Sequence, residues 1–373
     1  MNYRILIAAG GTGGHFYPGF ALAQELRTRG WQPLFLIKKN DISKPALAAA
    51  GLPYAEIEAI ALPRSFNPVA QAVFLFKFYR SLSLARRIIA DFSPDAAIGT
   101  GSYIAFPALL AARLAGVKAY IHESNAKFGL GNYLAGFFCD QVLLGLPVKD
   151  NPFSRKSSLT GTPVRAAFAS LPEKKSALAA LGLETGRLTA LIFGGSQGAG
   201  RLNEAAVASA VALKGLFQLI HITGRGNFKN VIEAYAAAGL SSEPGLKVFD
   251  YREDMPQLYA AADLVISRSG AGTVAELALL GKPALLVPLP SSAGGHQKAN
   301  ALVLADKEGA ICLEEGTDLA RRLTLRLKEH LDNPAKTAEM TANIKKTGIP
   351  DALQAAGLLA DIIEATTKIK GRS

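Results

Sequence analysis

The chain has 373 residues, of which 49% are hydrophobic and 19% carry a charge. This composition excludes a disordered protein, and the length exceeds what one compact core usually spans, so two domains are expected. The net charge of +11 would suit a nucleic-acid partner, but the sequence contains no zinc module, basic-aromatic RNP run or recognition helix. We therefore expect no nucleic acid among its partners.

The positive charge is concentrated in the first half of the chain. Residues 1–160 hold 17 Lys and Arg against 9 Asp and Glu, whereas residues 161–373 hold 24 against 21. An anionic membrane face suits this bias, and a merely solubilising charge is the alternative. No secretory signal or bilayer-spanning run is expected, and Cys139 and Cys312 suggest neither a disulfide framework nor a metal cluster. These features predict a cytosolic protein.

The first apolar run, residues 4–9, leads directly into a glycine-rich loop. Four glycines surround Thr12 before His15, and apolar residues at helical spacing follow. A strand, a glycine turn and a helix start aim backbone N–H groups and a helix dipole at an anion. This predicts a phosphate or pyrophosphate ligand. The alternative is a tight turn without a ligand, which needs fewer glycines.

Two common glycine loops do not fit. A P-loop needs Gly-Lys-Ser/Thr where this chain has His15 and Phe16. A dinucleotide fingerprint needs a third glycine at Phe16 and an acid after the second strand, where Lys38 and Lys39 stand. A P-loop is therefore excluded and a nicotinamide dehydrogenase is disfavoured.

Short β-branched runs alternate with alanine-rich helical stretches, which is typical of a doubly wound parallel sheet. Strands are predicted near residues 3–9, 33–37, 95–99, 118–121, 141–144 and 158–160, and again near 189–193, 217–222, 246–249, 263–266 and 284–287. The loop Gly194–Gly198 echoes the first glycine loop. The chain is therefore predicted to form two Rossmann-like α/β domains facing across a cleft, where ligands of open α/β sheets usually bind.

The segment Ser267–Thr273 links a predicted strand to a helix. Hydroxyls of Ser269 and Thr273, together with the helix N-terminus, can neutralise a diphosphate without a metal. Glu276 can accept hydrogen bonds from a ribose diol; the alternative is a role limited to compensating the helix dipole. Further on, Gln297 and Asn300 lie one helical turn apart, so their amides can face the same sugar hydroxyls. The alternative is that this loop is a solvent-exposed connection.

Together these segments resemble one family. The motifs are Gly10–His15, His122–Asn125, Gly161–Arg165, Gly194–Ala199, Ser267–Glu276 and His296–Asn300, and they come in the order and spacing of the MurG family. The match runs through nearly the whole chain. The resemblance implies a GT-B fold and a hexosyltransferase that moves N-acetylglucosamine (GlcNAc) from UDP-GlcNAc to a polyprenyl-pyrophosphate-linked acceptor in peptidoglycan synthesis.

The resemblance also implies the site residues. It assigns loop contacts to Thr12, Gly13 and Gly14, a polar contact to Asn125, donor sugar-phosphate contacts to Arg165 and Ser196, and a backbone contact with uracil to Arg252. It assigns the diphosphate and ribose segment to Ala271, Gly272, Thr273, Val274, Ala275 and Glu276, and the recognition of GlcNAc to Gln297. The chain departs from the family pattern at Gly161-Thr-Pro, at Gly101-Ser-Tyr and before Gln297. These departures concern the acceptor side more than the donor.

The expected chemistry needs no metal or other cofactor. The chain contains no Asp-x-Asp for metal-bridged binding of a nucleotide sugar, so helix dipoles and Arg165 are expected to stabilise the leaving UDP. A base must take a proton from the acceptor hydroxyl. His15 is the first candidate, with orientation of the loop as its alternative role, and Glu123 is the second. His221 lies in an apolar run and is expected to be a satisfied core histidine.

The stretch Arg64 to Ala90 has five basic residues and no acids. At roughly 100° per residue, one stripe is apolar and predicts a core contact, while a second face mixes apolar and basic residues. The stripe is Phe74, Phe78, Leu82 and Ile89, and the mixed face is Val73, Phe76, Arg80, Leu84 and Arg87. The mixed face suits an anionic membrane surface; the alternative is a helix covered by protein, with snorkelling arginines.

The combined prediction is a three-part chain. Residues 1–163 form the acceptor-side and membrane-side domain, 164–345 the donor-side domain, and 346–373 a closing helix and basic tail packed on the first domain. The expected reaction is inverting transfer of GlcNAc to the MurNAc of undecaprenyl-pyrophosphoryl-MurNAc-pentapeptide, which converts lipid I to lipid II at the cytoplasmic face of the plasma membrane. The alternatives are a UDP-sugar 2-epimerase and a non-catalytic nucleotide-sugar-binding protein on the same fold.

Overall fold

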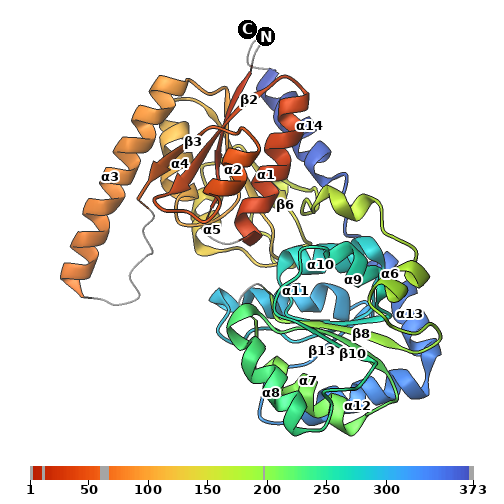
Figure 1. Cartoon of the computed structure of the whole chain (residues 1–373). Coiled ribbons are helices and arrows are strands. Elements are labelled where there is room, and N and C mark those ends of the chain that lie inside the picture. Colours follow the sequence, from red (N-terminus) through yellow and green to blue (C-terminus); the bar gives the residue numbers. More distant parts are fainter. Residues whose placement is uncertain (1–2, 11–12, 59–66, 196–197, 369–373) are drawn as a thin grey trace. The chain divides into compact units, whose positions relative to one another are not determined.

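The computed structural model describes residues 3–10, 13–58, 67–195 and 198–368. The predicted site residues Thr12 and Ser196, and the segment start Arg64, lie outside these ranges. The chain divides into two compact units, unit 1 with Met1–Arg165 and Ile349–Ser373, and unit 2 with Ala166–Gly348. Each unit is an α/β structure built on its own parallel sheet (Figure 1).

Unit 1 contains a seven-stranded sheet in the order β3-β2-β1-β4-β5-β6-β7. Its strands are β1 (Arg4–Ala8), β2 (Gln32–Lys38), β3 (Tyr54–Ile57), β4 (Ala96–Gly99), β5 (Lys118–Glu123), β6 (Gln141–Leu144) and β7 (Ser157–Leu159). Its helices are α1 (Gly13–Thr28), α2 (Lys44–Ala49), α3 (Pro68–Phe92), α4 (Ala105–Leu114), α5 (Leu130–Gly136) and α14 (Ala355–Lys368).

Unit 2 contains a six-stranded sheet in the order β10-β9-β8-β11-β12-β13. Its strands are β8 (Thr189–Phe193), β9 (Gln218–Ile222), β10 (Leu246–Phe249), β11 (Leu264–Ser267), β12 (Ala284–Leu286) and β13 (Ala310–Cys312). Its helices are α6 (Lys174–Ala180), α7 (Gly200–Ala212), α8 (Phe228–Ala237), α9 (Met255–Ala261), α10 (Ala271–Leu280), α11 (His296–Ala305), α12 (Leu319–Asp332) and α13 (Pro334–Ile344).

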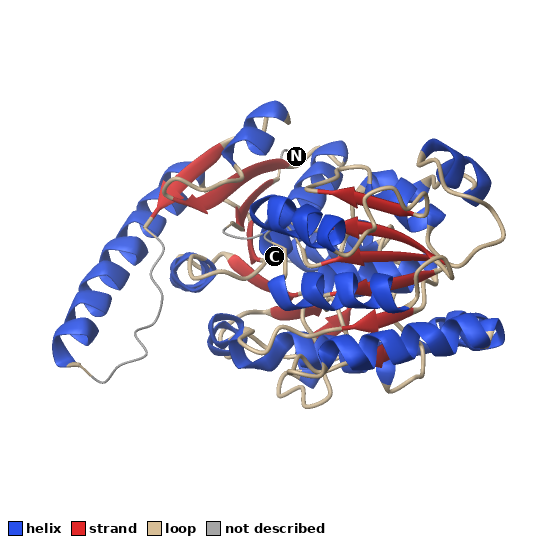
Figure 2. Ribbon diagram, turned by 60° about the horizontal axis from the view of Figure 1, so that its bottom comes forward, coloured by secondary structure: helices blue, strands red, loops and turns tan. Residues whose placement is uncertain are grey.

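Both faces of each sheet are covered by helices (Figure 2), which explains the continuous apolar runs of the central strands. In β1, Ile5 and Ile7 belong to a core that includes residues of α1 and α14. Leu6 and Ala8 belong to a different core that includes residues of α3 and α4. Because successive side chains of a strand point to opposite faces, such a strand needs apolar residues at every position.

Each sheet has a topological switch point, where successive connections run to opposite sides of the first strand. In unit 1 this point lies between β1 and β4, and in unit 2 it lies between β8 and β11. Ligands of doubly wound folds bind outside the carboxyl ends of the strands at this point. The loops that follow these four strands are therefore the places to look for a site.

The sequence reading missed two strands, β3 and β13. β3 is an edge strand that carries Glu56 and a half-exposed Tyr54, so it lacks the apolar run of a central strand. β13 has only three residues and pairs with β12 through Ala310, Ile311 and Cys312. The other predicted strands are present, with ends that differ by one or two residues.

Helix α3 begins at a well-formed cap and extends beyond the core. The Asn67 side chain accepts a hydrogen bond from the backbone N–H of Val69 at 2.9 Å, and Pro68 occupies the first helical position. Ser81, Ala85 and Ile89 are buried, and all three lie in the later turns of the helix. The earlier turns of α3 extend away from the sheet of unit 1 (Figure 1), and their apolar side chains Val69, Val73, Leu75 and Phe76 are exposed.

Helix α14, at the end of the described chain, packs against α1 in unit 1 (Figure 1). Leu359, Ala360 and Ile363 of α14 share a buried core with Leu22 and Leu26 of α1. Trp31 donates from its indole N–H to Glu364 at 2.9 Å. The last helix is thus an integral part of unit 1, although it follows unit 2 in the sequence.

Candidate active site

In unit 1 the loops after β1 and β4 meet at the switch point through His15 and Thr100. His15 lies in the first turn of α1, and Thr100 directly follows β4. The imidazole Nδ1 lies 3.1 Å from the Thr100 carbonyl oxygen, and the Thr100 hydroxyl donates to the His15 carbonyl at 2.6 Å. The first bond orients the His15 imidazole, and the second ties the His15 backbone to Thr100.

The hydrogen bond to Thr100 also determines the tautomer of His15. A carbonyl oxygen only accepts hydrogen bonds, so Nδ1 must carry the proton. In the neutral ring Nε2 then holds a lone pair, and it has no hydrogen-bond partner among the described residues. A half-buried imidazole with an available Nε2 lone pair is equipped to accept a proton from a hydroxyl.

Gly101 leaves the space that the His15 ring occupies. Its φ of +105° lies in the region that favours glycine, and a Cβ added there would lie 2.4 Å from His15 Nδ1. Any side chain at this position would therefore displace the imidazole. The chain retains glycine here, although the next residue departs from the family pattern noted above.

Glu123 ends β5 and is buried, with both carboxylate oxygens in use. Oε1 accepts from the backbone N–H and the side-chain amide of Asn125, at 3.0 and 2.9 Å. Oε2 accepts from the backbone N–H of Gly129 at 3.0 Å and from the Asn132 amide at 2.9 Å. Glu123 thus holds the loop that carries Asn125, and its hydrogen bonds favour an organising role over proton transfer.

His122 ties β5 to the segment that leaves the sheet. Its Nε2 donates to the Gly161 carbonyl at 3.1 Å, and its Nδ1 lies 3.3 Å from the Ser124 hydroxyl. Burial lowers the pKa of His122, so the ring is neutral at pH 7. The half-buried Arg165 is the last residue of this stretch of unit 1. The predicted motif Gly161–Arg165 is therefore anchored to β5.

In unit 2 the described glycines of the loop after β8 have a backbone that favours glycine. Gly195 and Gly198 have φ values of +86° and +74°, and the Gly198 N–H donates to the Gly195 carbonyl at 2.9 Å. A Cβ on Gly198 would lie 2.2 Å from the Thr223 carbonyl oxygen. This close approach requires glycine at position 198.

The loop after β11 is hydrogen-bonded to residues of α11. Ser269 is fully buried, and its hydroxyl donates to the Gln297 carbonyl at 2.7 Å. The Asn300 amide donates to the Ser269 carbonyl at 3.1 Å, and Asn300 is also fully buried. The interpretation of Ser269 and Asn300 as ligand-facing groups was therefore wrong: both side chains join the loop after β11 to α11, which packs against α10.

Arg268 is a structural residue of this loop that the sequence reading did not single out. Its guanidinium donates to the carbonyls of Val287 and Pro288 at 3.1 and 3.3 Å and forms an ion pair with Glu315 at 2.5 Å. It thereby joins the ends of β11 and β12 and the segment after β13. Its partners are far away in the sequence, so no local pattern could reveal this role.

Glu276 lies in the second turn of α10, and Tyr259 orients its carboxylate. The Tyr259 hydroxyl donates to Glu276 Oε2 at 2.8 Å. The Tyr259 ring is fully buried and makes edge contacts with Phe168 and Phe193, at centroid distances of 5.7 and 6.0 Å. Tyr259, which the sequence reading also missed, is therefore a rigid support for Glu276.

Gln297 and Arg252 complete the predicted donor-side residues. Gln297 Oε1 accepts from the backbone N–H of Leu289 at 2.9 Å, which directs its amide N–H groups elsewhere. Arg252 follows β10 at the same edge of the sheet, and its side chain pairs with Asp254 and lies over the Phe249 ring at 4.5 Å. Asp254 and the Phe249 ring thus hold the Arg252 side chain close to its own loop.

Two expectations about other residues can be compared with the structure. His221 is buried, with Nδ1 2.9 Å from the Tyr235 hydroxyl and Nε2 3.1 Å from Asn203 Oδ1. Burial lowers its pKa to about 3, so its reading as a satisfied core histidine is confirmed. Among the described residues, no group of three or more His, Cys, Asp or Glu side chains is placed to hold a metal ion.

Comparison with known proteins matches two stretches of the chain to the two domains of one glycosyltransferase family. Residues 5–144 match the N-terminal domain of glycosyltransferase family 28, and residues 189–355 match the C-terminal domain of that family. The UDP-N-acetylglucosamine--N-acetylmuramyl-(pentapeptide) pyrophosphoryl-undecaprenol N-acetylglucosamine transferase of Elusimicrobium minutum is 36% identical over 365 residues. That alignment covers 97% of this chain and 99% of the relative.

Solved structures give the same result. The crystal structure of Acinetobacter baumannii MurG superposes with a TM-score of 0.78 at 28% identity, over 97% of this chain and 99% of that one. A Listeria monocytogenes protein described as a UDP-N-acetylglucosamine 2-epimerase has a TM-score of 0.65 at 15% identity, over 98% and 97% of the two chains. That second likeness shows the GT-B fold alone. The chain belongs to the MurG family of glycosyltransferases.

Proposed function

We propose that this enzyme transfers GlcNAc from UDP-GlcNAc to the MurNAc of the polyprenyl-pyrophosphoryl acceptor lipid I and so forms lipid II. The observation that carries the proposal is His15, which is locked through Nδ1 and presents a basic Nε2 at the switch point of unit 1. A nucleotide-sugar-binding protein without activity has no use for such a group. Residues 1–163 and the closing segment 346–373 then serve the acceptor, and residues 164–345 serve the donor.

Most of the backbone N–H groups and side chains proposed to hold the donor belong to unit 2. The first N–H groups of α10 have no partner within the helix, so Ala271, Gly272 and Thr273 can donate to the diphosphate. Val274 and Ala275 continue this turn, Glu276 accepts from the ribose hydroxyls, and Gln297 donates to the GlcNAc hydroxyls. Ser196 and Arg165 contact the sugar-phosphate, and the backbone at Arg252 contacts uracil.

The reaction is a single displacement with inversion at the sugar carbon. His15 Nε2 takes the proton from the acceptor hydroxyl as its oxygen forms a bond to the anomeric carbon, while the bond from that carbon to the UDP oxygen breaks. The electron pair of the broken bond leaves with UDP. The helix dipole of α10 stabilises the resulting negative charge. Thr12, Gly13, Gly14 and Asn125 position the acceptor.

Incubating the enzyme with labelled UDP-GlcNAc, with and without a lipid I analogue, tests this function. Acceptor-dependent appearance of label in a lipid-linked disaccharide and release of UDP in equal amount are the expected results. Acceptor-independent formation of a UDP-sugar epimer would assign an epimerase. Binding of UDP-GlcNAc with no turnover in either mixture would assign a sensor.

Replacing Tyr259 with phenylalanine should weaken UDP binding by about 0.5–1.5 kcal/mol, because the Glu276 carboxylate loses the hydrogen bond that orients it. Calorimetry with UDP measures this loss. The matched ligand is 2′,3′-dideoxy-UDP, which has no ribose diol for Glu276 to bind. Equal losses for UDP and for the dideoxy compound would show that Tyr259 acts only on the packing of unit 2.

We propose further that α3 seats the enzyme on the anionic cytoplasmic face of the plasma membrane as a peripheral protein. Phe76 and Tyr79 are 63% and 70% exposed, and the Arg80 guanidinium lies 5.9 Å from the centre of the Phe76 ring. Val73 and Leu84 are also exposed on this helix, next to basic side chains. Within the described residues, no helix is both long and apolar enough to cross a bilayer.

The double substitution Arg80→Glu/Arg87→Glu should reduce binding to vesicles that contain anionic lipid, because each basic residue near such a surface contributes about 1 kcal/mol. Flotation with vesicles at low and high salt measures the effect, and transfer to a short-chain soluble acceptor should be spared. Lys229→Glu/Arg321→Glu is the matched control, since it makes the same charge change at exposed positions of unit 2. Equal binding by both double variants would argue against α3 as the membrane contact.

A further inference from the structure

A hollow of about 770 Å³ lies in unit 2 at the amino-terminal ends of the strands, whereas the donor-side loops follow their carboxyl ends. Its lining includes Leu188, Asp263 and Pro283, which stand immediately before β8, β11 and β12. The glycine turn and the Ser267–Glu276 segment follow the other ends of β8 and β11. The hollow is therefore separate from the donor site, and its volume lies within the usual range for small-molecule sites.

The charges in this hollow do not cancel locally. Asp263 pairs with Lys174 and also accepts from the backbone N–H of Thr189 at 2.9 Å. Arg187 donates to the Gly215 carbonyl at 2.7 Å and pairs with Glu184 at 3.5 Å. Lys282 is the remaining cation: its ammonium donates to the neutral Ala262 carbonyl at 2.6 Å and forms no ion pair with a described carboxylate. Removing a charge from water without an opposite charge beside it is costly, so an anion bound in the hollow would stabilise the half-buried Lys282 ammonium.

The environment of Lys282 makes its charge sensitive to pH. Burial lowers the pKa of its ammonium, Asp263 raises it and Lys174 lowers it, and the net result is a pKa of about 8. Besides Lys174, Arg187 and Asp263, the hollow contains His330, whose Nδ1 lies 2.8 Å from the Thr337 hydroxyl. Burial also lowers the pKa of His330, so this ring is neutral at pH 7. Lys282 therefore carries most of its charge at pH 7 and little at pH 9.5.

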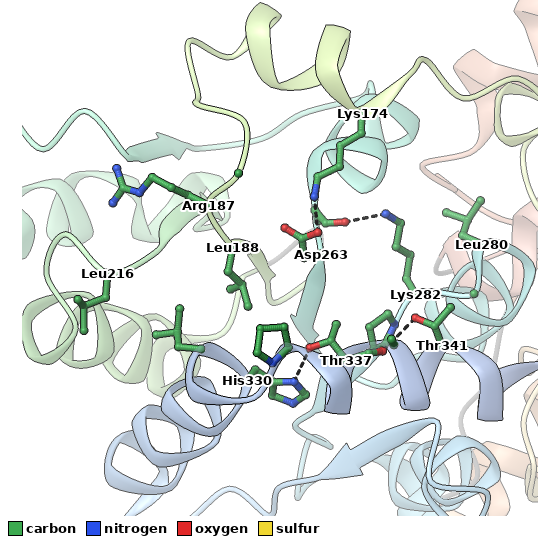
Figure 3. Close-up of a pocket in the computed structure, with 17 residues that line it drawn as sticks. Lys174, Arg187, Leu188, Leu216, Asp263, Leu280, Lys282, His330, Thr337 and Thr341 are labelled. Atoms are coloured by element: carbon green, nitrogen blue, oxygen red, sulfur yellow. Dashed lines mark hydrogen bonds and ion pairs between the residues drawn. The ribbon is translucent and has the colours of Figure 1, made fainter.

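The rest of the hollow is largely apolar. Figure 3 shows Lys174 and Lys282 approaching from different sides of Asp263, with Leu188 and His330 further along the same hollow. Leu280, Pro283 and Pro334 add apolar surface to the lining. A bare inorganic anion would leave this surface uncovered. An anion with an apolar body would cover it and bring its acidic group to Lys282.

We propose that this hollow is a second ligand site, which binds a small organic anion that joins an acidic group to an apolar body, with Lys282 as its counter-ion. Such a ligand would bind independently of the donor, since the two sites lie at opposite ends of the strands of one sheet. The proposal does not depend on which sugar the enzyme transfers.

The test is calorimetric titration of the full-length enzyme with naphthalene-2-sulfonate, with the donor site saturated by UDP. The sulfonate keeps its charge from pH 7 to pH 9.5, so any change of affinity over this range comes from the protein. The wild type should bind about tenfold more weakly at pH 9.5 than at pH 7, which is the factor expected when a charge-assisted hydrogen bond is lost. Lys282→Arg should bind with nearly the same affinity at both pH values, because arginine remains charged.

Lys282→Met should bind weakly at both pH values, and thermal unfolding will show whether this variant is folded. Lys298→Met, a change at an exposed lysine of unit 2 outside the hollow, should bind as the wild type does. Wild-type affinity in a folded Lys282→Met variant, a loss of affinity in Lys298→Met, or no saturable binding by the wild type would each overturn the proposal.

Discussion

Replacing His15 with alanine is expected to lower kcat by roughly 10²–10⁴-fold while UDP-GlcNAc affinity stays nearly unchanged. The residue belongs to unit 1, whereas the proposed donor contacts of α10 and α11 belong to unit 2. Losing the base removes proton acceptance in the transition state, which lowers kcat without weakening ground-state binding of the donor. Steady-state kinetics with a lipid I analogue, together with calorimetry for UDP, separates the two quantities.

His15→Asn is the informative control for this prediction. The asparagine amide N–H can donate to the Thr100 carbonyl as Nδ1 does, but asparagine has no basic nitrogen at the Nε2 position. If His15 is the base, both variants lose kcat to a similar extent. If the asparagine variant keeps its turnover, or if only the acceptor KM rises in the alanine variant, His15 positions the loop and Glu123 becomes the candidate base.

Replacing Glu276 with alanine should weaken UDP binding by about 1–3 kcal/mol, because ribose hydroxyls that donated to the carboxylate are left without a partner. The Tyr259 hydroxyl loses its acceptor in the same variant, which adds to the cost. Calorimetry with UDP measures the change, and thermal unfolding of the free protein reports any loss of stability caused by Tyr259.

The decisive comparison uses 2′,3′-dideoxy-UDP. Wild type should bind this compound less tightly than UDP, and Glu276→Ala should bind the two with nearly equal affinity. Unchanged affinity for UDP in the variant would leave Glu276 as a residue that compensates the dipole of α10. The Glu276 and Tyr259 variants should not be additive, because both act on the same hydrogen bonds.

The fold could be predicted from the sequence because its signals are local. Apolar runs such as residues 189–193 predicted strands that are buried on both faces, and glycine loops after the runs marked the starts of helices. The apolar stripe of α3 was also predicted correctly: Ile89 is buried, and Phe78 contacts Phe106 at a centroid distance of 5.8 Å. The edge strand β3 was not predicted, because an edge strand needs no apolar run.

The site could be predicted only as a set of positions. The sequence identified His15, but the proton location comes from a carbonyl that lies 85 residues further along the chain. Glu123 looked like a free carboxylate until the fold surrounded it with donors from the following loop and α5. Ser269 and Asn300 looked like ligand contacts because the sequence does not say which side of a loop faces the protein.

The sequence by itself therefore determined the two strand–glycine loop–helix units, the family and the amphipathic character of α3, since all of these depend on residue type and spacing along the chain. Only the tertiary structure decided which nitrogen of His15 is basic, which residue supports Glu276 and which of the lysines and arginines that line the hollow of unit 2 forms no ion pair with a described carboxylate. Hydrogen bonds and ion pairs depend on distances of a few ångströms between groups that are far apart in the chain, and only the folded packing sets those distances.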